Sequence, residues 1–183
     1  MSVDLQERSN LMKQYLGDLL LCIYAFHYKK GKFLENFRNM TSEEIVVEKT
    51  VINNHLDSIY LRLANLADRD SRVYSLPQLR KAAEAVITDT EVLNKISVTG
   101  QALYDNHLKN LNDNVRNQYI AHINDQFERV WSIWKDDEYD CLEITKDVLA
   151  YFDLLTQTEN KFSTKFGSSQ NPSFDMREKL FSV

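Results

Sequence analysis

Apolar residues recur at helical spacing along nearly the whole chain, and this pattern constrains the fold more than any other feature. Only four Gly and two Pro occur among the 183 residues, so the chain lacks the turn residues that a β-sandwich or barrel requires. No segment shows the strict alternation of apolar and polar residues that is typical of a half-buried strand. The pattern therefore predicts an all-α, up-and-down helical bundle.

The predicted bundle contains four long helices and one or two short ones, in a single domain over 1–167. The first long helix is expected from Asp4 to Tyr28, after which the basic stretch 29–32 would form a flexible exit. Near the other end, Gly167 follows the last apolar stripe. Residues 168–183 are therefore predicted to form a mobile tail.

Side chains that accept hydrogen bonds from the first unpaired backbone N–H groups predict where the later helices begin. Asp140 is expected to open the last helix, which should run to Phe166. Gly100 lies inside a helical pattern and costs roughly 1 kcal/mol relative to Ala, which predicts a break or kink there. Three pairs have the spacing of a capping box: Thr41 with Glu44, Ser75 with Gln78, and Thr88 with Glu91.

The formal net charge of −5 means that the molecule as a whole does not attract nucleic acid, so any contact with a polyanion must be local. The longest apolar run, Leu19 to Phe26, is too short to cross a bilayer, and no signal peptide precedes it. We therefore expect a cytoplasmic protein with no membrane segment. In that compartment Cys22 and Cys141 should be buried, reduced thiols.

Several common catalytic and metal-binding motifs are absent from the sequence. The chain has no glycine-rich phosphate loop, no Glu-x-x-His pair and no His-Glu-x-x-His motif. We therefore expect no cofactor and no metal site. His27, His55 and His107 each fall near an apolar stripe, which predicts half-buried, hydrogen-bonded histidines.

One segment, 115–122, carries residue types suited to chemistry on RNA. Arg116, Tyr119 and His122 recur every three residues and form a slowly drifting stripe on one helix face. The guanidinium fork of arginine matches phosphate, and histidine can exchange a proton near neutral pH. Along one helix, however, Arg116 and His122 are separated by roughly 9 Å of rise. A surface arginine and a helix-end histidine would have the same spacing, so the spacing alone leaves both interpretations open.

This segment resembles the Arg-x(4–6)-His signature of the HEPN superfamily, with five residues between Arg116 and His122. The polar Asn117 directly after the arginine and the small Ala121 directly before the histidine are also similar to that family.

Two upstream stretches, 59–68 and 75–79, resemble the abortive-infection-type branch of HEPN proteins. Together with the expected order of helices, the resemblance covers roughly Leu5 to Phe166.

The resemblance implies a homodimer that joins through the helix of the motif and brings two Arg/His sets into one cleft. It implies a metal-independent endoribonuclease, acting in phage defence or a toxin–antitoxin system, that leaves a 2′,3′-cyclic phosphate. Arg116 and His122 would be catalytic, and Asn117 would orient the phosphate or the histidine. Tyr119 would pack across the dimer or stack on a base of the RNA.

An antitoxin or a nucleotidyltransferase is the protein partner that the resemblance implies. The HEPN toxins silenced by a nucleotidyltransferase carry a tyrosine two residues after the histidine. This chain has Asn124 at that position, so regulation through that tyrosine is not expected here.

The alternative hypothesis is a non-catalytic helical-bundle interaction module or scaffold dimer. Phe127, Trp131 and Trp134 share one helical face, and aromatic side chains dominate binding hot spots. Core packing would account for the same three residues. The two hypotheses make different predictions. His122→Ala would abolish RNA cleavage under the first, whereas Arg116→Ala and His122→Ala would alter only dimerisation or partner capture under the second.

Overall fold

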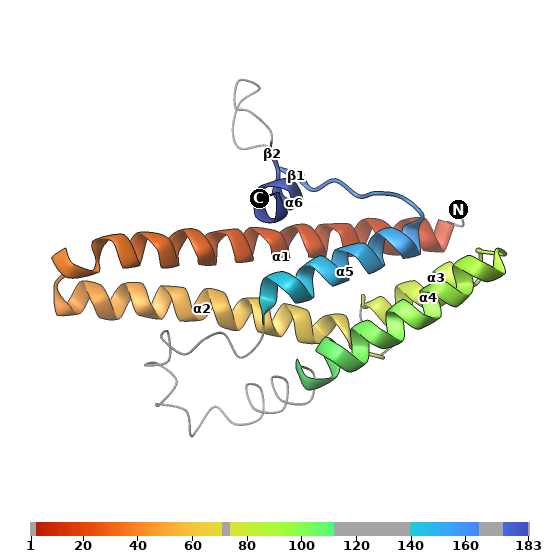
Figure 1. The fold of residues 1–183 in the computed structure, drawn as a ribbon, viewed down its shortest axis with the longest axis horizontal. Helices are drawn as coiled ribbons and strands as arrows, with labels where there is room; N and C mark the ends of the chain where they lie inside the picture. Colours follow the sequence, from red (N-terminus) through yellow and green to blue (C-terminus); the bar gives the residue numbers. More distant parts are fainter. Residues whose placement is uncertain (1–2, 71–73, 112–139, 165–173, 183) are drawn as a thin grey trace.

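The computed structural model describes residues 3–70, 74–111, 140–164 and 174–182 and confirms an all-α bundle for them. Helices α1 (Val3–Asn36) and α2 (Ser42–Leu66) form a long antiparallel hairpin, closed by the short 3₁₀ helix η1 (Phe37–Asn39) (Figure 1). Helix α5 (Cys141–Thr156) packs on both. The short α3 (Leu76–Glu84) and the longer α4 (Thr90–Leu103) lie at the end of the hairpin that holds the N-terminus (Figure 1).

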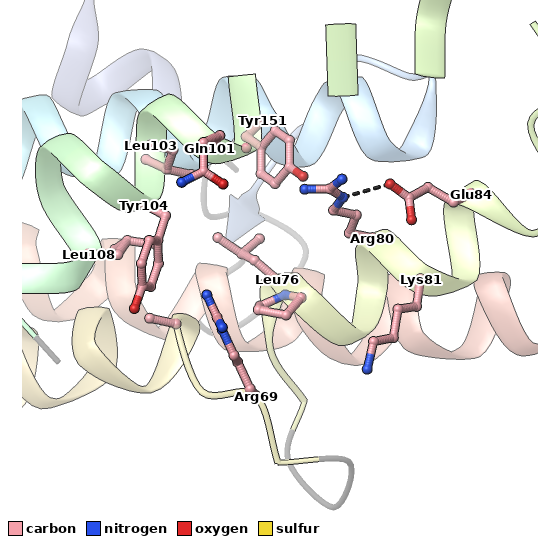
Figure 2. A pocket seen from close by; sticks show the side chains of 13 residues that line it. Arg69, Leu76, Arg80, Lys81, Glu84, Gln101, Leu103, Tyr104, Leu108 and Tyr151 are labelled. Carbon is pink, nitrogen blue, oxygen red and sulfur yellow. Dashed lines mark hydrogen bonds and ion pairs between the residues drawn. The ribbon is translucent and has the colours of Figure 1, made fainter. Parts of the chain in front are cut away.

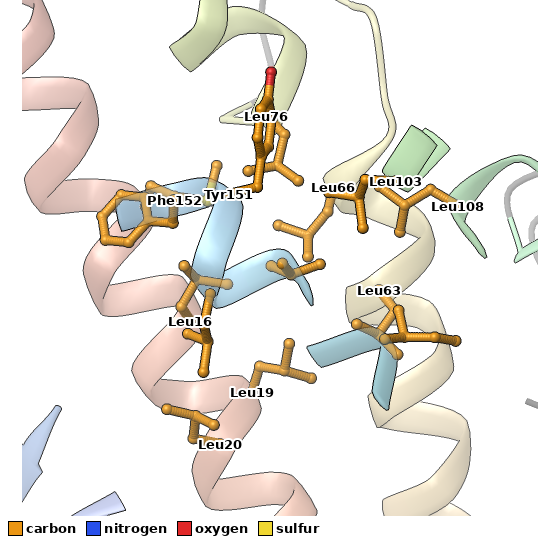
Figure 3. Packing of buried hydrophobic residues seen from close by; sticks show 14 of the residues in the cluster. Leu16, Leu19, Leu20, Leu63, Leu66, Leu76, Leu103, Leu108, Tyr151 and Phe152 are labelled. Atoms are coloured by element: carbon orange, nitrogen blue, oxygen red, sulfur yellow. The ribbon is translucent and has the colours of Figure 1, made fainter. Parts of the chain in front are cut away.

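The core is formed mainly by the apolar stripe of α1, which faces α2 and α5. Leu16 and Leu19 of α1 lie opposite Leu63 and Leu66 of α2 in Figure 3, and all four are fully buried. Each such side chain contributes about 1.5–3 kcal/mol when it is removed from water. Further buried members come from α3, α4 and α5: Leu76, Leu79, Ile96, Leu103, Val148 and Phe152.

Helix α1 is longer than the sequence predicts. It continues through residues 29–32 and ends at Asn36 instead of near Tyr28, so the expected flexible exit is wrong. Phe33, only 2% exposed, extends the buried stripe by two further turns. In addition, the ammonium group of Lys29 lies 3.2 Å from the carboxylate of Glu48, which ties this part of α1 to α2. Tertiary contacts therefore keep a basic, glycine-containing stretch helical.

Three of the predicted helix starts, at Thr41, Ser75 and Asp140, are confirmed, and two of them have a side-chain cap. At α2 both halves of the capping box are present, because the Glu44 amide donates to Thr41 Oγ1 at 3.2 Å and the Thr41 amide donates to Glu44 Oε2 at 2.7 Å. At α5, Asp140 Oδ1 accepts from the amides of Leu142 and Glu143, each at 3.0 Å. Both caps satisfy N–H groups that the helix itself leaves unpaired.

The other two capping boxes are wrong. Helix α4 begins after Asp89 rather than Thr88, since the Asp89 carboxylate accepts from two backbone amides of the first turn. Ser75 does precede α3, but its side chain makes no capping hydrogen bond. Its expected partner, Gln78, donates instead to the backbone carbonyl of Arg69 at 2.9 Å.

The break predicted at Gly100 is also wrong. Helix α4 is continuous through Gly100 to Leu103 and then widens into the π-helical turn η2 (Tyr104–Leu108). A Cβ at position 100 would lie 2.8 Å from Tyr151 Cζ and closer still to Tyr151 Oη. The glycine therefore serves the close packing of α4 on Tyr151 of α5, and not a change in helix direction.

The C-terminal region differs from the prediction in two ways. Helix α5 ends at Thr156 instead of Phe166, because Gln157 adopts a left-handed conformation with φ 54°. The strands β1 (Ser163–Thr164) and β2 (Phe174–Asp175) then pair antiparallel, and the short α6 (Met176–Phe181) packs on α1 (Figure 1).

The mobile tail predicted for 168–183 is therefore corrected for residues 174–182. Met176 is fully buried. Asp175 caps α6 and also accepts a hydrogen bond from the Phe162 amide at 2.8 Å. The Arg177 guanidinium pairs with Asp153 of α5. These contacts fix the C-terminal helix to the body of the bundle.

We expect Gly100→Ala to destabilise the fold although alanine is the better helix former. The added methyl group would collide with Tyr151, and overpacking of this kind costs about 1–3 kcal/mol. Gly31→Ala is the matched control, because Gly31 is also inside a helix and nothing lies within 4 Å of the point that a Cβ would occupy there. That substitution should stabilise by up to about 1 kcal/mol. The free energy of unfolding in urea would measure both, and equal effects would contradict the close packing described above.

We expect Met176→Ala to lower the free energy of unfolding by about 2–5 kcal/mol, as for other buried methionines. Lys179→Ala, at an exposed position of the same helix, should change stability by less than about 0.5 kcal/mol. Urea unfolding followed by circular dichroism would compare the two. A mobile tail would make the two variants equally harmless.

Candidate functional site

The residues of the predicted catalytic site lie outside the described residues. Arg116, Asn117, Tyr119 and His122 all fall within 112–139, the segment between Leu111 and Asp140. The aromatic residues of the alternative hypothesis, Phe127, Trp131 and Trp134, fall within the same segment. The described residues form a different candidate site, which contains none of these side chains.

That site is a cavity of about 370 Å³ where the end of α2, α3, α4, η2 and α5 meet. Its volume is within the range of small-molecule sites in proteins. Apolar side chains of α3, α4 and η2 form part of the wall, namely Leu76, Pro77, Leu103 and Leu108. The polar lining consists of Arg69, Arg80, Lys81, Glu84, Gln101, Tyr104 and Tyr151 (Figure 2).

Arg69 is held at this cavity by two contacts. Gln78 of α3 donates to its backbone carbonyl, which fixes the segment that leaves α2. The guanidinium group lies 5.1 Å from the ring centroid of Tyr104, over the ring. A cation over an aromatic face is stabilised by about 0.5–1 kcal/mol where it is exposed to solvent. Arg69 and Tyr104 thus form one preorganised, cationic and aromatic part of the wall (Figure 2).

Arg80 and Tyr151 form a second part of the wall. The Nε of Arg80 donates to Glu84 at 2.6 Å, one turn further along α3. Figure 2 shows the Arg80 guanidinium between the Glu84 carboxylate and the Tyr151 hydroxyl. Tyr151 is 2% exposed, and its hydroxyl has no hydrogen-bond partner among the described residues. An unpaired buried hydroxyl costs about 1–3 kcal/mol.

The ionisation of this group follows from its surroundings. Burial raises the pKa of Tyr151 to about 12, although the charge of the neighbouring Arg80 lowers it in part. The hydrogen bond to Glu84 raises the pKa of Arg80. At neutral pH the wall therefore offers a protonated phenol and a permanent cation side by side, and both are hydrogen-bond donors.

The residues of this cavity carry little signal in the sequence. Arg69 lies in a polar stretch that indicates only the end of a helix, and Arg80 and Lys81 are ordinary residues for an exposed helix face. Tyr151 has the spacing of a core residue. Gly100 is the one residue of the lining whose presence in the sequence could have indicated this site, because a glycine inside a helix often marks a close packing contact.

The predictions for the histidines hold in part. His107 is hydrogen-bonded through Nε2 to Asp147 at 3.1 Å and its side chain is 20% exposed, as expected. His55 is also half-buried. His27 is exposed on α1, so the prediction of a half-buried side chain is wrong for His27. Neither cysteine forms a disulfide; Cys141 is buried and Cys22 is partly buried.

Neither a metal centre nor a membrane span is found in the part of the chain that the structure describes. It contains no group of three His, Cys, Asp or Glu side chains placed to hold a metal ion. None of the helices in the described ranges combines the length and the apolar character that a bilayer crossing needs.

No family model matches this chain, and no curated protein or solved structure matches it either.

The raised pKa of Tyr151 predicts a pH dependence of stability. A tyrosine in the unfolded chain ionises near pH 10, whereas folded Tyr151 keeps its proton until about pH 12. The stabilisation from the neutral phenol is therefore fully present below pH 10 and is lost as pH rises toward 12. Tyr151→Phe should remove this part of the alkaline loss and should cost little at pH 8, where it deletes an unpaired hydroxyl.

Urea unfolding of the wild type and Tyr151→Phe at pH 8 and pH 11 would check this prediction. The measurement at pH 8 serves as the control for packing, and the change between the two pH values isolates the ionisation. Parallel stability curves for the two proteins would show that the Tyr151 hydroxyl is not shielded as described.

Proposed function

We propose that this chain is a metal-independent endoribonuclease of the HEPN type that acts in phage defence or a toxin–antitoxin system. The observation that carries the proposal is the Arg116–His122 spacing with Asn117 beside the arginine, the set that resembles the family's signature. The all-α bundle of the described residues is compatible with the fold that the resemblance implies.

In the proposed reaction, His122 takes the proton of the ribose 2′-hydroxyl or delivers a proton to the leaving 5′-oxygen. Arg116 would stabilise the negative charge that develops on the phosphoryl oxygens. Asn117 would orient the phosphate or the imidazole. The 2′-oxygen attacks the adjacent phosphorus while the bond to the 5′-oxygen breaks, which yields a 2′,3′-cyclic phosphate and a 5′-hydroxyl.

The proposal includes a homodimer, because residues 116 and 122 on one helix would be separated by roughly 9 Å of rise. A second subunit that joins through the same helix would supply the missing group, and Tyr119 would pack across that contact or stack on a base. Inhibition by an antitoxin or a nucleotidyltransferase partner would be expected of a toxin that cleaves cellular RNA.

We expect purified protein to cleave RNA in excess chelator, and His122→Ala to lower the rate by about 10²–10⁴-fold, the usual contribution of a general acid or base. Arg116→Ala should cause a loss of the same order, since it removes charge stabilisation at the phosphate. The assay would follow a labelled RNA and identify the cyclic phosphate at the new 3′ end.

His27→Ala is the matched control, because His27 is exposed on α1, far along the chain from the motif. It should leave the cleavage rate unchanged. Equal unfolding curves for all variants would exclude loss of the fold. Cleavage that stops in chelator, or that survives His122→Ala, would contradict the proposal.

The second candidate function is a non-catalytic scaffold dimer, in which a second copy of this chain covers apolar surface. One observation favours it: several large apolar side chains at the η1 end of the α1–α2 hairpin are exposed. They are Tyr28, Leu34, Phe37, Val46 and Val47. Under this hypothesis, the double variant Val46→Ser with Val47→Ser would convert a dimer to a monomer in analytical ultracentrifugation. Neither the wild type nor any of the variants above would cleave RNA.

A further inference from the structure

The cavity between α3, α4 and α5 concentrates positive charge in an acidic molecule. Its lining includes three cationic side chains, Arg69, Arg80 and Lys81, and one carboxylate, Glu84, whereas the whole chain has a net charge of −5. Glu84 is already paired with Arg80. No ion pair joins Arg69 or Lys81 to a carboxylate of the described residues.

The hydrogen-bonding groups of the cavity are mainly donors. Arg80 presents guanidinium N–H groups and Tyr151 presents a buried O–H with no acceptor among the described residues. Because the two lie next to each other (Figure 2), an anionic oxygen placed between them would accept from both. Such an oxygen would also remove the cost of leaving the Tyr151 hydroxyl unpaired.

The rest of the cavity wall is aromatic and apolar, and it would suit the uncharged part of a bound molecule. Tyr104 presents an aromatic ring whose position is fixed by Arg69 on its face, and Leu76, Pro77 and Leu103 add apolar surface. Tyr104 lies in the π-helical turn η2, and such turns occur frequently at functional sites. The cavity thus combines cations, oriented donors and an apolar wall within about 370 Å³.

We propose that this cavity binds a small phosphate-bearing molecule, with its phosphate oxygens at Arg80, Tyr151 and Arg69 and its uncharged part against Tyr104. Phosphate oxygens accept several charge-assisted hydrogen bonds at once, and arginine forks match their geometry. A small molecule is favoured over a polymer because the cavity has the volume of a small-molecule site. This inference is independent of the proposed ribonuclease activity, since it uses none of the residues in 112–139.

The test is isothermal titration calorimetry of the full-length chain with inorganic pyrophosphate and with ATP. Both should bind at one site per chain in the micromolar to millimolar range. Arg69→Gln should weaken binding about tenfold or more, as expected for the loss of a charge-assisted contact. Tyr104→Ala should weaken ATP more than pyrophosphate, because only ATP carries an aromatic body that can use the ring.

Arg62→Gln is the matched control. Arg62 also lies over a tyrosine, 5.6 Å from the ring centroid of Tyr15, but it does not line the cavity. It should leave both affinities unchanged, and thermal unfolding would establish that the two arginine variants are equally folded. A second titration on His122→Ala should match the wild type, which separates this site from the proposed catalytic one.

Three outcomes would overturn the proposal. The first is no heat of binding with either ligand at millimolar concentration, and the second is an equal loss in Arg69→Gln and Arg62→Gln. The third is loss of single-stranded RNA binding in Arg69→Gln without any binding of the small phosphates, which would assign the cavity to an RNA strand instead.

Discussion

The buried stripe of α1 is the constraint on which the rest of the fold depends. Helices α2, α3, α5 and α6 all pack against α1, and Leu16, Leu19, Leu20 and Ile23 in its centre are fully buried. A single long helix can serve as a common partner only if its apolar face is wide, and here consecutive leucines at 19 and 20 broaden that face. The hairpin, the short helix at its end and the C-terminal segment are all placed by contacts with this one surface.

Helix α4 packs mainly on α5, and the cavity lies beside it. Most of its contacts are with α5 and with its own continuation η2. One of them is the approach of Gly100 to Tyr151, and Arg80 of α3 also donates to Ser97 at 3.4 Å. The cavity adjoins this contact, since Gly100 and Tyr151 both line it. Polar and aromatic side chains in its lining include Arg69, Arg80, Gln101 and Tyr104. A close contact between two helices therefore positions a polar site beside it.

What the sequence predicts correctly is set by short-range interactions. The cap at Thr41 and Glu44 and the cap at Asp140 need only residues three or fewer positions away, and both are present. Helix α3 does begin after Ser75, although the expected capping bonds are absent there. The start at Thr88 fails because the Asp89 carboxylate accepts from the Glu91 amide in its place.

Tertiary contacts determine the features that the sequence does not show. The extension of α1 depends on burial of Phe33, the continuity of α4 depends on Tyr151 lying against Gly100, and the ordered C-terminal helix depends on Met176. Periodicity gives the face of a helix but not the element that covers it, and the cavity is lined by five segments that only the fold brings together.

The distribution of charge determines what kind of anion this molecule can hold. Several cationic side chains of the described residues are paired with a carboxylate. The pairs are Arg8–Asp4, Lys29–Glu48, Lys32–Glu35, Arg80–Glu84 and Arg177–Asp153. An anion more than about 8 Å from the surface is largely screened from the charges of the protein at physiological ionic strength. The cavity, in contrast, is lined by the cations Arg69 and Arg80. A small phosphate ligand places all of its charge within this favourable region. An RNA strand is longer than this cavity and would meet a molecule of net charge −5, so its binding would depend on a few cations at the point of cleavage, and Arg116 is the residue proposed for that role.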